Sequence, residues 1–400
     1  MKKYIFMTST LKNMGGAQLY LSSKLCWLKK NGWDVDVIYF DSTPSVIPVL
    51  REYTHCVKEL QYMPYYYSSK KTKKILAFLE TLIRPCSLQK VIIESTGKSI
   101  ALWGELLAKK IEAKHILFNL QEVDVVTNQS MIDFLLFKHK RKELIGIQET
   151  SLSKLFNSIK HPIKPSESYS LRAYMTNPVE DFDHPLIDVI KKENYDYVVG
   201  SISRLDKQFV VPAFDEFSEY VNLNKNKRFA LILIGDAPDS NNNRKYIEDT
   251  SRNINNLDVF ITGYLYPIPK RLLLKCNMFY ASAGSARVSS ELGIPTIVYD
   301  ACDSKTIGIL GYTTDNSLFR KDEPALPLSY YLDEILKFGK YPKIQAKERE
   351  LPDYSKHLDF IKCTIQTKEY FTKFKWNDNQ KKQSLIIPLL GPQLFFKIFK

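Results

Sequence analysis

Apolar residues in the first half of the chain form short runs that alternate with segments of helical periodicity. Residues 4–7 form the first run, a turn follows at residues 13–16, and residues 17–28 then carry apolar side chains at every third or fourth position. The next apolar run, at residues 35–40, makes the order strand, helix, strand, which predicts a right-handed parallel crossover. The remaining elements of this half are expected at residues 91–93 (strand), 100–113 (helix), 115–118 (strand) and 144–147 (strand).

A second series of short apolar runs begins near residue 196. The run at residues 229–234 is almost uninterrupted, as in a strand of a parallel sheet that is covered on both faces. Residues 184–196 are polar and separate the two series, so we interpret them as a linker. The pattern predicts an α/β chain with an N-terminal domain at residues 1–185, a C-terminal domain at 196–370 and a tail at 371–400. The other elements of the second series are expected at residues 197–201 (strand), 209–220 (helix), 259–261, 278–280 and 295–299 (strands).

Composition narrows the class of protein. With 44% apolar residues over 400 positions, the chain can form two cores and is not disordered over most of its length. The 57 Lys and Arg residues exceed the 44 Asp and Glu residues, and the net charge of +13 favours an anionic partner, such as nucleic acid, acidic lipid or a phosphorylated small molecule. Six dispersed cysteines, with no CxxC pair, argue against a zinc module or a disulfide scaffold and indicate a reduced, cytoplasmic setting.

The apolar segments of the chain are too short for a signal peptide or a membrane-spanning helix. The apolar stretch near the N-terminus is only about five residues long, which is shorter than a signal peptide needs. No segment reaches the roughly 20 apolar residues of a membrane span. Any contact with a membrane is therefore expected to be peripheral.

Chemistry is expected just after strands, because open α/β sheets bind ligands beyond the carboxyl ends of their strands. Gly15 and Gly16 follow the first strand and precede a helix, where glycine permits close approach of the backbone and unpaired amides can meet an anion. Arg204 and Lys207 follow the first strand of the second series, and two cations there could neutralise a diphosphate. A plain turn at the glycines, and a surface ion pair of Arg204 with Asp206, are the alternatives.

A later loop of the second series carries further candidates. Gly284 and Ser285 open a helix after the strand at residues 278–280, so their amides could cradle phosphate oxygens. On the same helix, Glu291 could accept hydrogen bonds from sugar hydroxyls. The alternative is a solvated carboxylate or an ion pair with Arg287, which lies four positions earlier.

Other signals in the sequence are less specific. Gly263 and Tyr264 follow another strand, where Tyr264 either borders a nucleobase pocket or packs in the core. The Asp-x-Asp pairs at residues 34–36 and 181–183 resemble carboxylate pairs that bind a divalent metal, but the first begins a strand and the second lies in a Pro-containing loop. We therefore expect no metal site.

Together these segments resemble the GT-B glycosyltransferases, and among them the large retaining family four. Residues 13–17 are similar to that family's N-terminal glycine loop, and residues 200–207 to its Gly-Arg-Leu…Lys segment. Residues 260–264 resemble the turn near the nucleotide base, and residues 282–297 the donor-sugar loop with the strand that follows it. Residues 177–180 are similar to the short Asn-containing motif before the second domain.

The resemblance implies two Rossmann-like parallel-sheet domains that face a central cleft, with the acceptor on the N-terminal domain and the donor on the C-terminal one. It implies transfer from a nucleotide-diphosphate sugar with no cofactor. It gives catalytic roles to Arg204 and Lys207, which would hold the donor diphosphate, and to Glu291. The donor-binding residues that it implies are Gly15, Gly16, Gly263, Tyr264, Gly284, Ser285 and Arg287.

The donor loop departs from the pattern of the family. That family usually carries two glutamates eight positions apart, whereas here the loop is shorter and only Glu291 remains. Counted back from Gly293, the position of the second glutamate falls on Val288. The anomeric outcome of the transfer therefore stays open.

Two basic clusters beside apolar residues suggest where the protein works. Residues 70–74 include four lysines before the apolar residues 75–79, and residues 138–142 form a second cluster after the apolar residues 134–137. This combination suits the interface of an anionic membrane, so we expect a cytoplasmic protein at the inner face of the membrane. The apolar tail at residues 385–400 either docks there too or packs back on the protein as a C-terminal helix, as is common in GT-B enzymes.

The expected function is glycosyl transfer of the hexosyl type to a glycan or a lipid-linked glycan in surface polysaccharide synthesis. The alternatives are a nucleotide-sugar epimerase on the same fold, a non-enzymatic nucleic-acid-binding protein and a degenerate, donor-free scaffold. The basic runs adjoin aliphatic residues and no nucleic-acid module is recognised, which argues against a nucleic-acid partner. The sequence leaves the base, the sugar, the acceptor and the linkage open.

Overall fold

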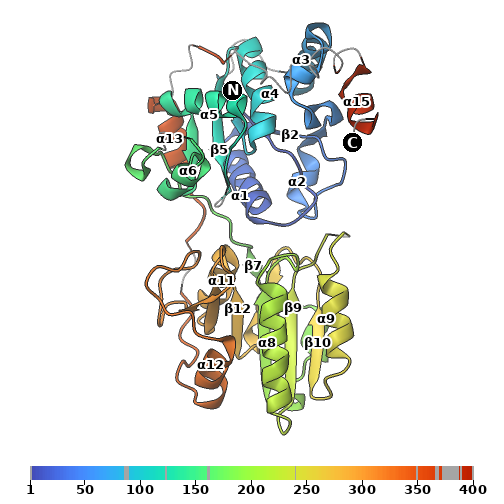
Figure 1. Cartoon of the computed structure of the whole chain (residues 1–400), viewed down its shortest axis with the longest axis vertical. Coiled ribbons are helices and arrows are strands. Elements are labelled where there is room, and N and C mark those ends of the chain that lie inside the picture. The colour runs from blue at the N-terminus through green and yellow to red at the C-terminus, as the bar shows by residue number, and fades with distance from the viewer. Residues whose placement is uncertain are drawn as a thin grey trace. The chain divides into compact units, whose positions relative to one another are not determined.

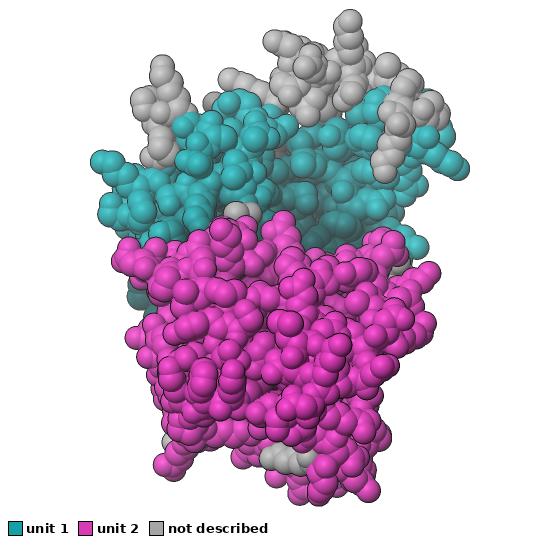
Figure 2. Space-filling view, turned by 60° about the horizontal axis from the view of Figure 1, so that its bottom comes forward, with its two compact units in different colours: residues 1–13, 17–174, 352–400 teal, residues 14–16, 175–351 magenta. Residues whose placement is uncertain are grey.

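The structure is a computed structural model of the chain and describes every residue except 1, 85–89, 122–123, 160–162, 239, 348–349, 365–368, 372–386, 388–389 and 399–400. The chain forms two compact units, which Figure 2 shows in different colours, and each unit has its own sheet and core. The N-terminal unit comprises Met1–Asn13, Ala17–Tyr174 and Pro352–Lys400. The C-terminal unit comprises Met14–Gly16 and Met175–Leu351.

The N-terminal unit is built on a six-stranded parallel sheet with the order β3-β2-β1-β4-β5-β6 (Figure 1). Ile5 and Ile93, on neighbouring central strands, are fully buried. The strand order reverses at the junction of β1 and β4, which makes that junction the switch point of the sheet. The strands are β1 (Lys2–Met7), β2 (Trp33–Tyr39), β3 (Thr54–Cys56), β4 (Lys90–Ser95), β5 (Lys114–Asn119) and β6 (Leu144–Gly146).

Helices cover this sheet by burying one apolar stripe each. In α4, Ile100, Trp103 and Leu107 recur at helical spacing and are fully buried, as the periodicity of residues 100–113 predicts. The α-helices of this unit are α1 (Gly16–Lys30), α2 (Val49–Glu52), α3 (Ser69–Ile83), α4 (Lys98–Ile111), α5 (Gln129–Lys140), α6 (Glu149–Leu155), α13 (Ser355–Thr364) and α15 (Pro392–Ile398). Short 3-10 helices are η1 (Lys58–Gln61), η2 (Pro64–Tyr66) and η3 (Pro165–Glu167).

The C-terminal unit repeats the same plan. Its six-stranded sheet has the order β10-β9-β8-β12-β13-β14, and only β14 runs antiparallel. The strands are β8 (Tyr197–Ile202), β9 (Phe229–Ile234), β10 (Leu257–Ile261), β12 (Met278–Ala281), β13 (Thr296–Tyr299) and β14 (Thr306–Ile309), with a separate pair β7 (Val179–Glu180) and β11 (Ile268–Pro269). The helices are α7 (Pro185–Val189), η4 (Lys192–Asn194), α8 (Val210–Leu223), α9 (Asn243–Ser251), α10 (Lys270–Lys275), α11 (Ala283–Ser290), α12 (Leu328–Leu332) and the π-helix η5 (Asp333–Lys337). The predicted α/β class is therefore confirmed.

The division into units differs at both ends from the boundaries expected from the sequence. The main part of the C-terminal unit begins at Met175 rather than at residue 196, because β7 pairs with β11 of that unit. Residues 184–196, expected as a linker, contain α7 and the fully buried Ile190, which packs in the core of the C-terminal unit with Leu186 and Ile187. At the other end, residues 352–364 return to the N-terminal unit as α13 and the turn before it. Most of the tail expected at residues 371–400 lies outside the described residues.

A buried ion pair joins Lys24 to Glu94 in the core of the N-terminal unit, with both side chains 0% exposed and Nζ 2.6 Å from Oε2. Lys24 Nζ also donates to the Tyr20 hydroxyl at 2.9 Å and to His357 Nδ1 at 3.2 Å. The hydroxyls of Tyr4 and Tyr20 donate to the Glu94 carboxylate at 2.5 and 2.8 Å. Because the three hydrogens of the ammonium group all have partners, the cluster avoids the cost of an unpaired buried charge.

His357 links this cluster to the segments that connect the two units. Its Nε2 donates to the Arg172 carbonyl at 2.9 Å, which leaves Nδ1 to accept from Lys24. The ring of Tyr354 packs edge-on against that of Tyr174, with 5.3 Å between centroids. The outgoing chain and the returning chain therefore leave the N-terminal unit at neighbouring points.

A second buried network surrounds Glu105. Its Oε2 accepts from Lys138 Nζ at 2.8 Å and from His115 Nδ1 at 2.6 Å, and its Oε1 accepts from the Phe371 backbone N–H at 2.8 Å. Lys138 Nζ also donates to Glu143 Oε2 at 2.6 Å. Lys138 is fully buried, so it is not available to the basic cluster at residues 138–142 that the sequence suggested for a membrane interface.

We expect the free energy of unfolding to fall as the pH drops from about 6.5 towards 3. Burial and the adjacent Lys24 lower the pKa of His357 to about 3 in the folded chain, whereas an unfolded histidine takes up its proton near 6.5. Between these values only the unfolded state binds the proton, which costs about 2 kcal/mol of stability between about pH 7 and pH 5. Urea denaturation at the two pH values should show this loss in the wild type and a smaller loss in His357→Gln.

The matched control for this experiment is His184→Gln, which changes the histidine that caps α7 in the other unit. This variant should keep the acid sensitivity of the wild type. If His357→Gln also keeps it in full, the buried cluster is not the source of the sensitivity.

Candidate functional site

The strand order of the C-terminal unit reverses at the junction of β8 and β12. Ligands of such sheets bind in the crevice beyond the carboxyl ends of the strands at that switch point. The loop after β8 holds Arg204 and Lys207, and the start of α11 after β12 holds Gly284 and Ser285. The structure therefore brings these four predicted residues to the two sides of one switch point.

Gly235 holds the loop after β8 in place. Its φ is +150°, and a Cβ at this position would lie 1.8 Å from the Ser203 carbonyl oxygen, so only glycine fits without a shift of the backbone. The Ser203 N–H donates to the Ile234 carbonyl at 3.1 Å, and the Leu205 N–H donates to the Asp236 carbonyl at 3.0 Å. The loops after β8 and β9 are therefore tightly joined, and the predicted arginine lies within the joined segment.

Arg204 is partly exposed, and its Nε lies 3.0 Å from Asp206 Oδ1. The ion pair that the sequence offered as an alternative is therefore present. It does not exclude anion binding, because a guanidinium has five N–H donors and this contact engages only Nε. Lys207 is exposed, and its backbone N–H donates to the Arg204 carbonyl at 3.2 Å in the turn before α8.

The loop after β9 contributes a carboxylate that the sequence analysis did not assign to the site. Asp236 accepts two contacts from Arg244 Nη1, at 3.1 and 3.2 Å, and its Oδ1 accepts from the Ala237 N–H at 2.9 Å. A Cβ at Gly263 would lie 3.6 Å from Asp236 Oδ2, so the carboxylate borders the loop after β10. Its place directly after a buried strand is a signal that could have found Asp236.

Tyr264 lies in the same group of loops. Burial raises the pKa of its hydroxyl, Arg204 lowers it, and the carboxylates of Asp206 and Asp236 raise it. Tyr264 therefore lies close enough to Arg204, the cation predicted to bind the diphosphate, for the charge of Arg204 to affect its hydroxyl. Among the described residues the buried Tyr264 hydroxyl has no hydrogen-bond partner, which is the condition that a bound ligand would relieve.

Helix α11 presents its first turn at the switch point. Its N-cap residue, Ser282, makes no side-chain capping bond, so that side chain does not occupy the amides of the first turn. A Cβ at Gly284 would lie 3.3 Å from the Met175 carbonyl oxygen, and a Cβ at Gly16 would lie 3.1 Å from Met175 Sδ. Gly16 belongs to the C-terminal unit. Gly16 and Gly284 therefore both lie beside Met175 of that unit. Gly15 directly precedes Gly16.

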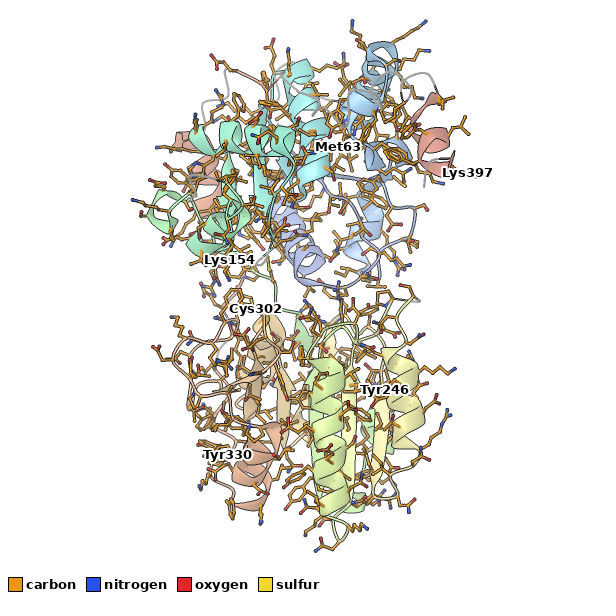
Figure 3. The ribbon with its side chains drawn as sticks, viewed as in Figure 1. Met63, Lys154, Tyr246, Cys302, Tyr330 and Lys397 are labelled. Carbon is orange, nitrogen blue, oxygen red and sulfur yellow. The ribbon has the colours of Figure 1, made fainter. Side chains whose placement is uncertain are left out.

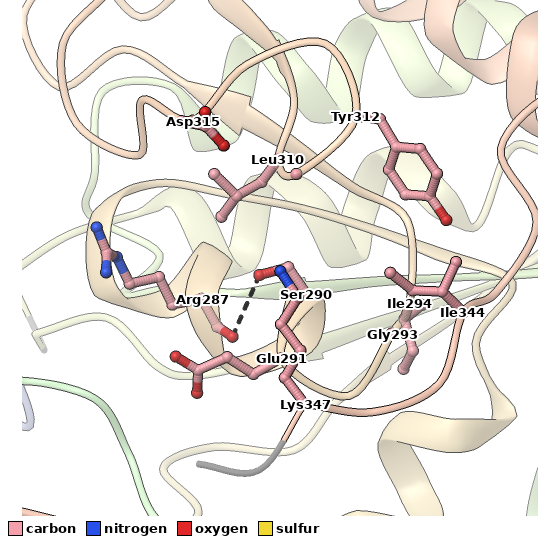
Figure 4. Close-up of a pocket in the computed structure, with 11 residues that line it drawn as sticks. Arg287, Ser290, Glu291, Gly293, Ile294, Leu310, Tyr312, Asp315, Ile344 and Lys347 are labelled. Atoms are coloured by element: carbon pink, nitrogen blue, oxygen red, sulfur yellow. Dashed lines mark hydrogen bonds between the residues drawn. The ribbon is translucent and has the colours of Figure 1, made fainter. Parts of the chain in front are cut away.

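Arg287 and Glu291 lie further along α11 than Gly284 and Ser285. Glu291 is the C-cap of α11, about 10 Å along the helix axis from Gly284. Both residues line a separate pocket of about 230 Å³ (Figure 4), together with Ser290, Gly293, Leu310, Tyr312, Asp315, Ile344 and Lys347 among others. Arg287 Nε lies 3.3 Å from Ser317 Oγ. Glu291 is therefore separated from Gly284 and Ser285 by most of the length of α11, whereas Arg287 lies one turn from Gly284.

The N-terminal unit has polar side chains at the corresponding edge of its own sheet. Lys98, after β4, lies with its Nζ 2.5 Å from Asp124 Oδ2, in the segment after β5. Thr10, after β1, donates through Oγ1 to Asp41 Oδ2, after β2, at 2.9 Å. Sequence reasoning named none of these residues, because each pair joins loops that lie about 30 residues apart in the chain.

The acidic pairs considered for metal binding are engaged by cations. Lys3 Nζ lies 2.7 Å from a carboxylate oxygen of Asp34 and of Asp36. Arg271 lies 3.0 and 2.8 Å from the carboxylates of the pair at residues 181–183. Over the described part of the chain, no group of three or more His, Cys, Asp or Glu residues is placed to hold a metal ion. No helix there is both long enough and apolar enough to cross a bilayer.

Known proteins resemble this chain in structure but not in sequence. No family model and no curated protein matches it. The crystal structure of Anabaena Alr3699/HepE in complex with UDP and glucose aligns with a TM-score of 0.58 at 13% identity, over 99% of each chain. Sucrose-phosphate synthase from Thermosynechococcus elongatus aligns at 0.54 and 13% identity, over 99% of this chain and 100% of that one.

A glycosyltransferase from Rickettsia africae aligns with a TM-score of 0.54 at 14% identity, over 84% of this chain and 89% of that one. These likenesses, together with two Rossmann-like sheets of matching plan, show that the chain has the α/β GT-B fold. The predicted fold is therefore confirmed.

We expect Gly235→Ala to destabilise the protein by at least about 3 kcal/mol, because the new methyl group would overlap the Ser203 carbonyl. Gly311→Ala is the matched control, since Gly311 has a φ of +80° and nothing within 4 Å of its Cβ position. The control should cost about 1–2 kcal/mol for the left-handed backbone alone. Urea unfolding measures both losses, and equal values would show that the contact with Ser203 does not fix the loop.

Proposed function

We propose that this protein is a glycosyltransferase that takes its sugar from a nucleoside-diphosphate sugar. The observation that carries the proposal is the convergence of Arg204, Lys207 and the first turn of α11 at the switch point between β8 and β12. A diphosphate needs cations and N–H donors at one place, and this edge of the sheet offers both. The Anabaena neighbour was solved with UDP and glucose, which supports a nucleotide sugar as the donor.

The proposed catalysis is electrostatic. When the bond between the sugar and the diphosphate breaks, negative charge grows on the leaving diphosphate. The planar guanidinium of Arg204 can bind two of its oxygens, and Lys207 adds a point charge. Amides of the first turn of α11, at Gly284 and Ser285, point their dipoles at the same charge. Because these groups meet more charge in the transition state than in the ground state, they lower the barrier.

The nucleoside would lie over the loops after β9 and β10. Tyr264 has a buried hydroxyl that a ligand could satisfy, and Gly263 leaves room for close approach. Asp236, held in place by Arg244, can accept hydrogen bonds from hydroxyl or N–H groups of the nucleoside. Asp206, 3.0 Å from Arg204, would orient the guanidinium.

The acceptor that we propose is a glycan or a lipid-linked glycan, to which the enzyme adds a hexosyl group in surface polysaccharide synthesis. The polar pairs at the carboxyl edge of the N-terminal sheet, Lys98 with Asp124 and Thr10 with Asp41, suit an acceptor rich in hydroxyls. We propose that no metal takes part, because the cations already serve the diphosphate. Work at the inner, cytoplasmic face of a membrane is supported by the exposed lysines of the N-terminal unit.

The proposal does not depend on the pocket at the far end of α11. Arg287 and Glu291 lie in that pocket, and their predicted roles in donor binding and catalysis stay predictions. The same holds for Gly15 and Gly16 as donor-binding residues. The donor site rests instead on the loops after β8, β9, β10 and β12.

We expect Arg204→Ala and Lys207→Ala each to lower kcat/KM by about 100-fold, because each removes one group that stabilises the growing charge. A thermal-shift screen with UDP, GDP and their sugars first identifies the donor, and release of the nucleoside diphosphate then measures turnover. Both variants should unfold at the wild-type urea concentration, because both side chains are partly or fully open to solvent.

Lys225→Ala, at an exposed lysine just beyond α8, is the matched control and should keep the wild-type rate. Wild-type rates in both Arg204→Ala and Lys207→Ala would refute the assignment. Conversion of the donor into an isomeric sugar nucleotide, without any acceptor, would indicate an epimerase instead.

A further inference from the structure

We propose that the N-terminal unit docks on an anionic lipid bilayer through one face that α3 and α15 build together. This inference rests on the proposed function, because a lipid-linked acceptor lies in a membrane. Binding to a membrane can nevertheless be measured without any turnover. The docking face consists of Lys70, Lys71, Lys74, Phe78, Leu390, Leu394 and Lys397.

Helix α3 separates its apolar and basic residues onto opposite sides. Ile75, Leu76, Leu79 and Ile83 are buried against the N-terminal unit. At 100° per residue, Lys70 and Lys74 fall on the opposite side and Lys71 lies at its edge, and all three are exposed. The acidic residue of α3, Glu80, lies off this side, and its Oε2 is 2.9 Å from Lys110 Nζ. The solvent side of α3 therefore carries cations without a carboxylate of its own.

Phe78 distinguishes this side from an ordinary solvated helix face. It lies between Lys71 and Lys74 around the helix and is 53% exposed. A large aromatic side chain among lysines is costly in water but stable at the boundary between lipid headgroups and acyl chains.

Helix α15 extends the docking face. Phe396 stacks on Tyr62, with 5.7 Å between centroids and parallel planes, and meets the ring of Tyr66 at 5.4 Å. Tyr66 belongs to η2, immediately before α3, so α15 is attached next to that helix. The tail thus packs back on the protein over its described residues, which is one of the two arrangements that the sequence left open.

The attached helix still presents apolar residues to solvent. Leu394 is 47% exposed, and Lys397 is exposed on the same side of α15. Leu390, just before the helix, is 40% exposed. Figure 3 shows Lys397 at the outer margin of the N-terminal unit, pointing away from it. The combination of α3 and α15 repeats one pattern, exposed lysines beside exposed apolar side chains.

The basic cluster at residues 138–142 is less suited to binding a membrane than the lysines of α3. Lys138 is fully buried with Glu105 and Glu143, and Arg141 Nε lies 3.2 Å from Glu143 Oε1. Two of the cations at residues 138–142 are thereby paired inside the protein. Only Lys140 and Lys142 of that cluster are exposed, whereas all four lysines of α3 are exposed.

The test is flotation of the full chain with phosphatidylcholine vesicles that do or do not contain phosphatidylglycerol. The wild type should bind only the anionic vesicles, and added salt should release it. Lys70→Glu with Lys74→Glu should weaken binding at least about 25-fold, since each cation near the surface contributes about fivefold. Phe78→Ser and Leu394→Ser should each weaken binding while keeping its salt dependence, because they remove only apolar contact.

The charge-matched control is Lys225→Glu with Lys245→Glu, two exposed lysines of the C-terminal unit, and it should bind as the wild type does. An equal loss in this control would mean that net charge, and not the docking face, decides binding. Absence of wild-type binding to anionic vesicles at low salt would overturn the proposal. Tight binding to duplex DNA that Lys70→Glu with Lys74→Glu abolishes, without vesicle binding, would also overturn it, in favour of nucleic acid.

Nucleotide binding separates this proposal from the proposed function. Lys70→Glu with Lys74→Glu should keep the wild-type thermal shift with the nucleoside diphosphate and the wild-type urea midpoint. If the wild-type protein binds anionic vesicles but no nucleotide, the transferase assignment is refuted and the proposed docking face is still supported.

Discussion

The packing of Gly235 on the Ser203 carbonyl determines how the loops of the C-terminal sheet share one edge. Parallel strands end together, but the loops after them are free to diverge unless something joins them. Here the backbone of one loop lies directly on the next, and that loop contains Arg204. A single extra methyl group would separate them. The guanidinium of Arg204, the carboxylate of Asp236 and the hydroxyl of Tyr264 therefore lie within electrostatic reach of one another because position 235 has no side chain.

The N-terminal unit is organised by buried charge instead. Lys24 with Glu94, and Lys138 with Glu105, each need a partner from the last part of the chain: the ring of His357 in one network and the backbone N–H of Phe371 in the other. A buried ion pair contributes little net stability, but removing one of its partners leaves a polar group unsatisfied. Among the described residues, these hydrogen bonds of His357 and Phe371 specify where the returning segment packs.

The apolar pattern of neighbouring residues predicted the strands and helices, whose formation depends on residues close together in the sequence. The uninterrupted apolar run at residues 229–234 forms β9, which is buried along its whole length, as predicted. The cations Arg204 and Lys207 lie just after β8, the first strand of the second series. Pairing over distance was not predictable. Lys138 looks like a surface cation in the sequence, since the carboxylate of Glu105 that neutralises it lies 33 positions away. The pairing of Asp236 with Arg244 had no local signal either, because both residue types are common on exposed loops.

The position of the missing donor-loop glutamate is occupied by a core residue in this chain. The family that the sequence resembles has a glutamate where this chain has Val288, which is 2% exposed and packs among Phe279 and Ile294. An ionised carboxylate at this position would be buried in an apolar cluster, so the valine is a core residue rather than a gap in an open site. Glu291 lies one turn further along, at the C-cap of α11, and lines a separate pocket. In the donor site that we propose, hydroxyl recognition at this edge of the sheet therefore falls to a carboxylate on another loop, Asp236, which two contacts from Arg244 hold in place.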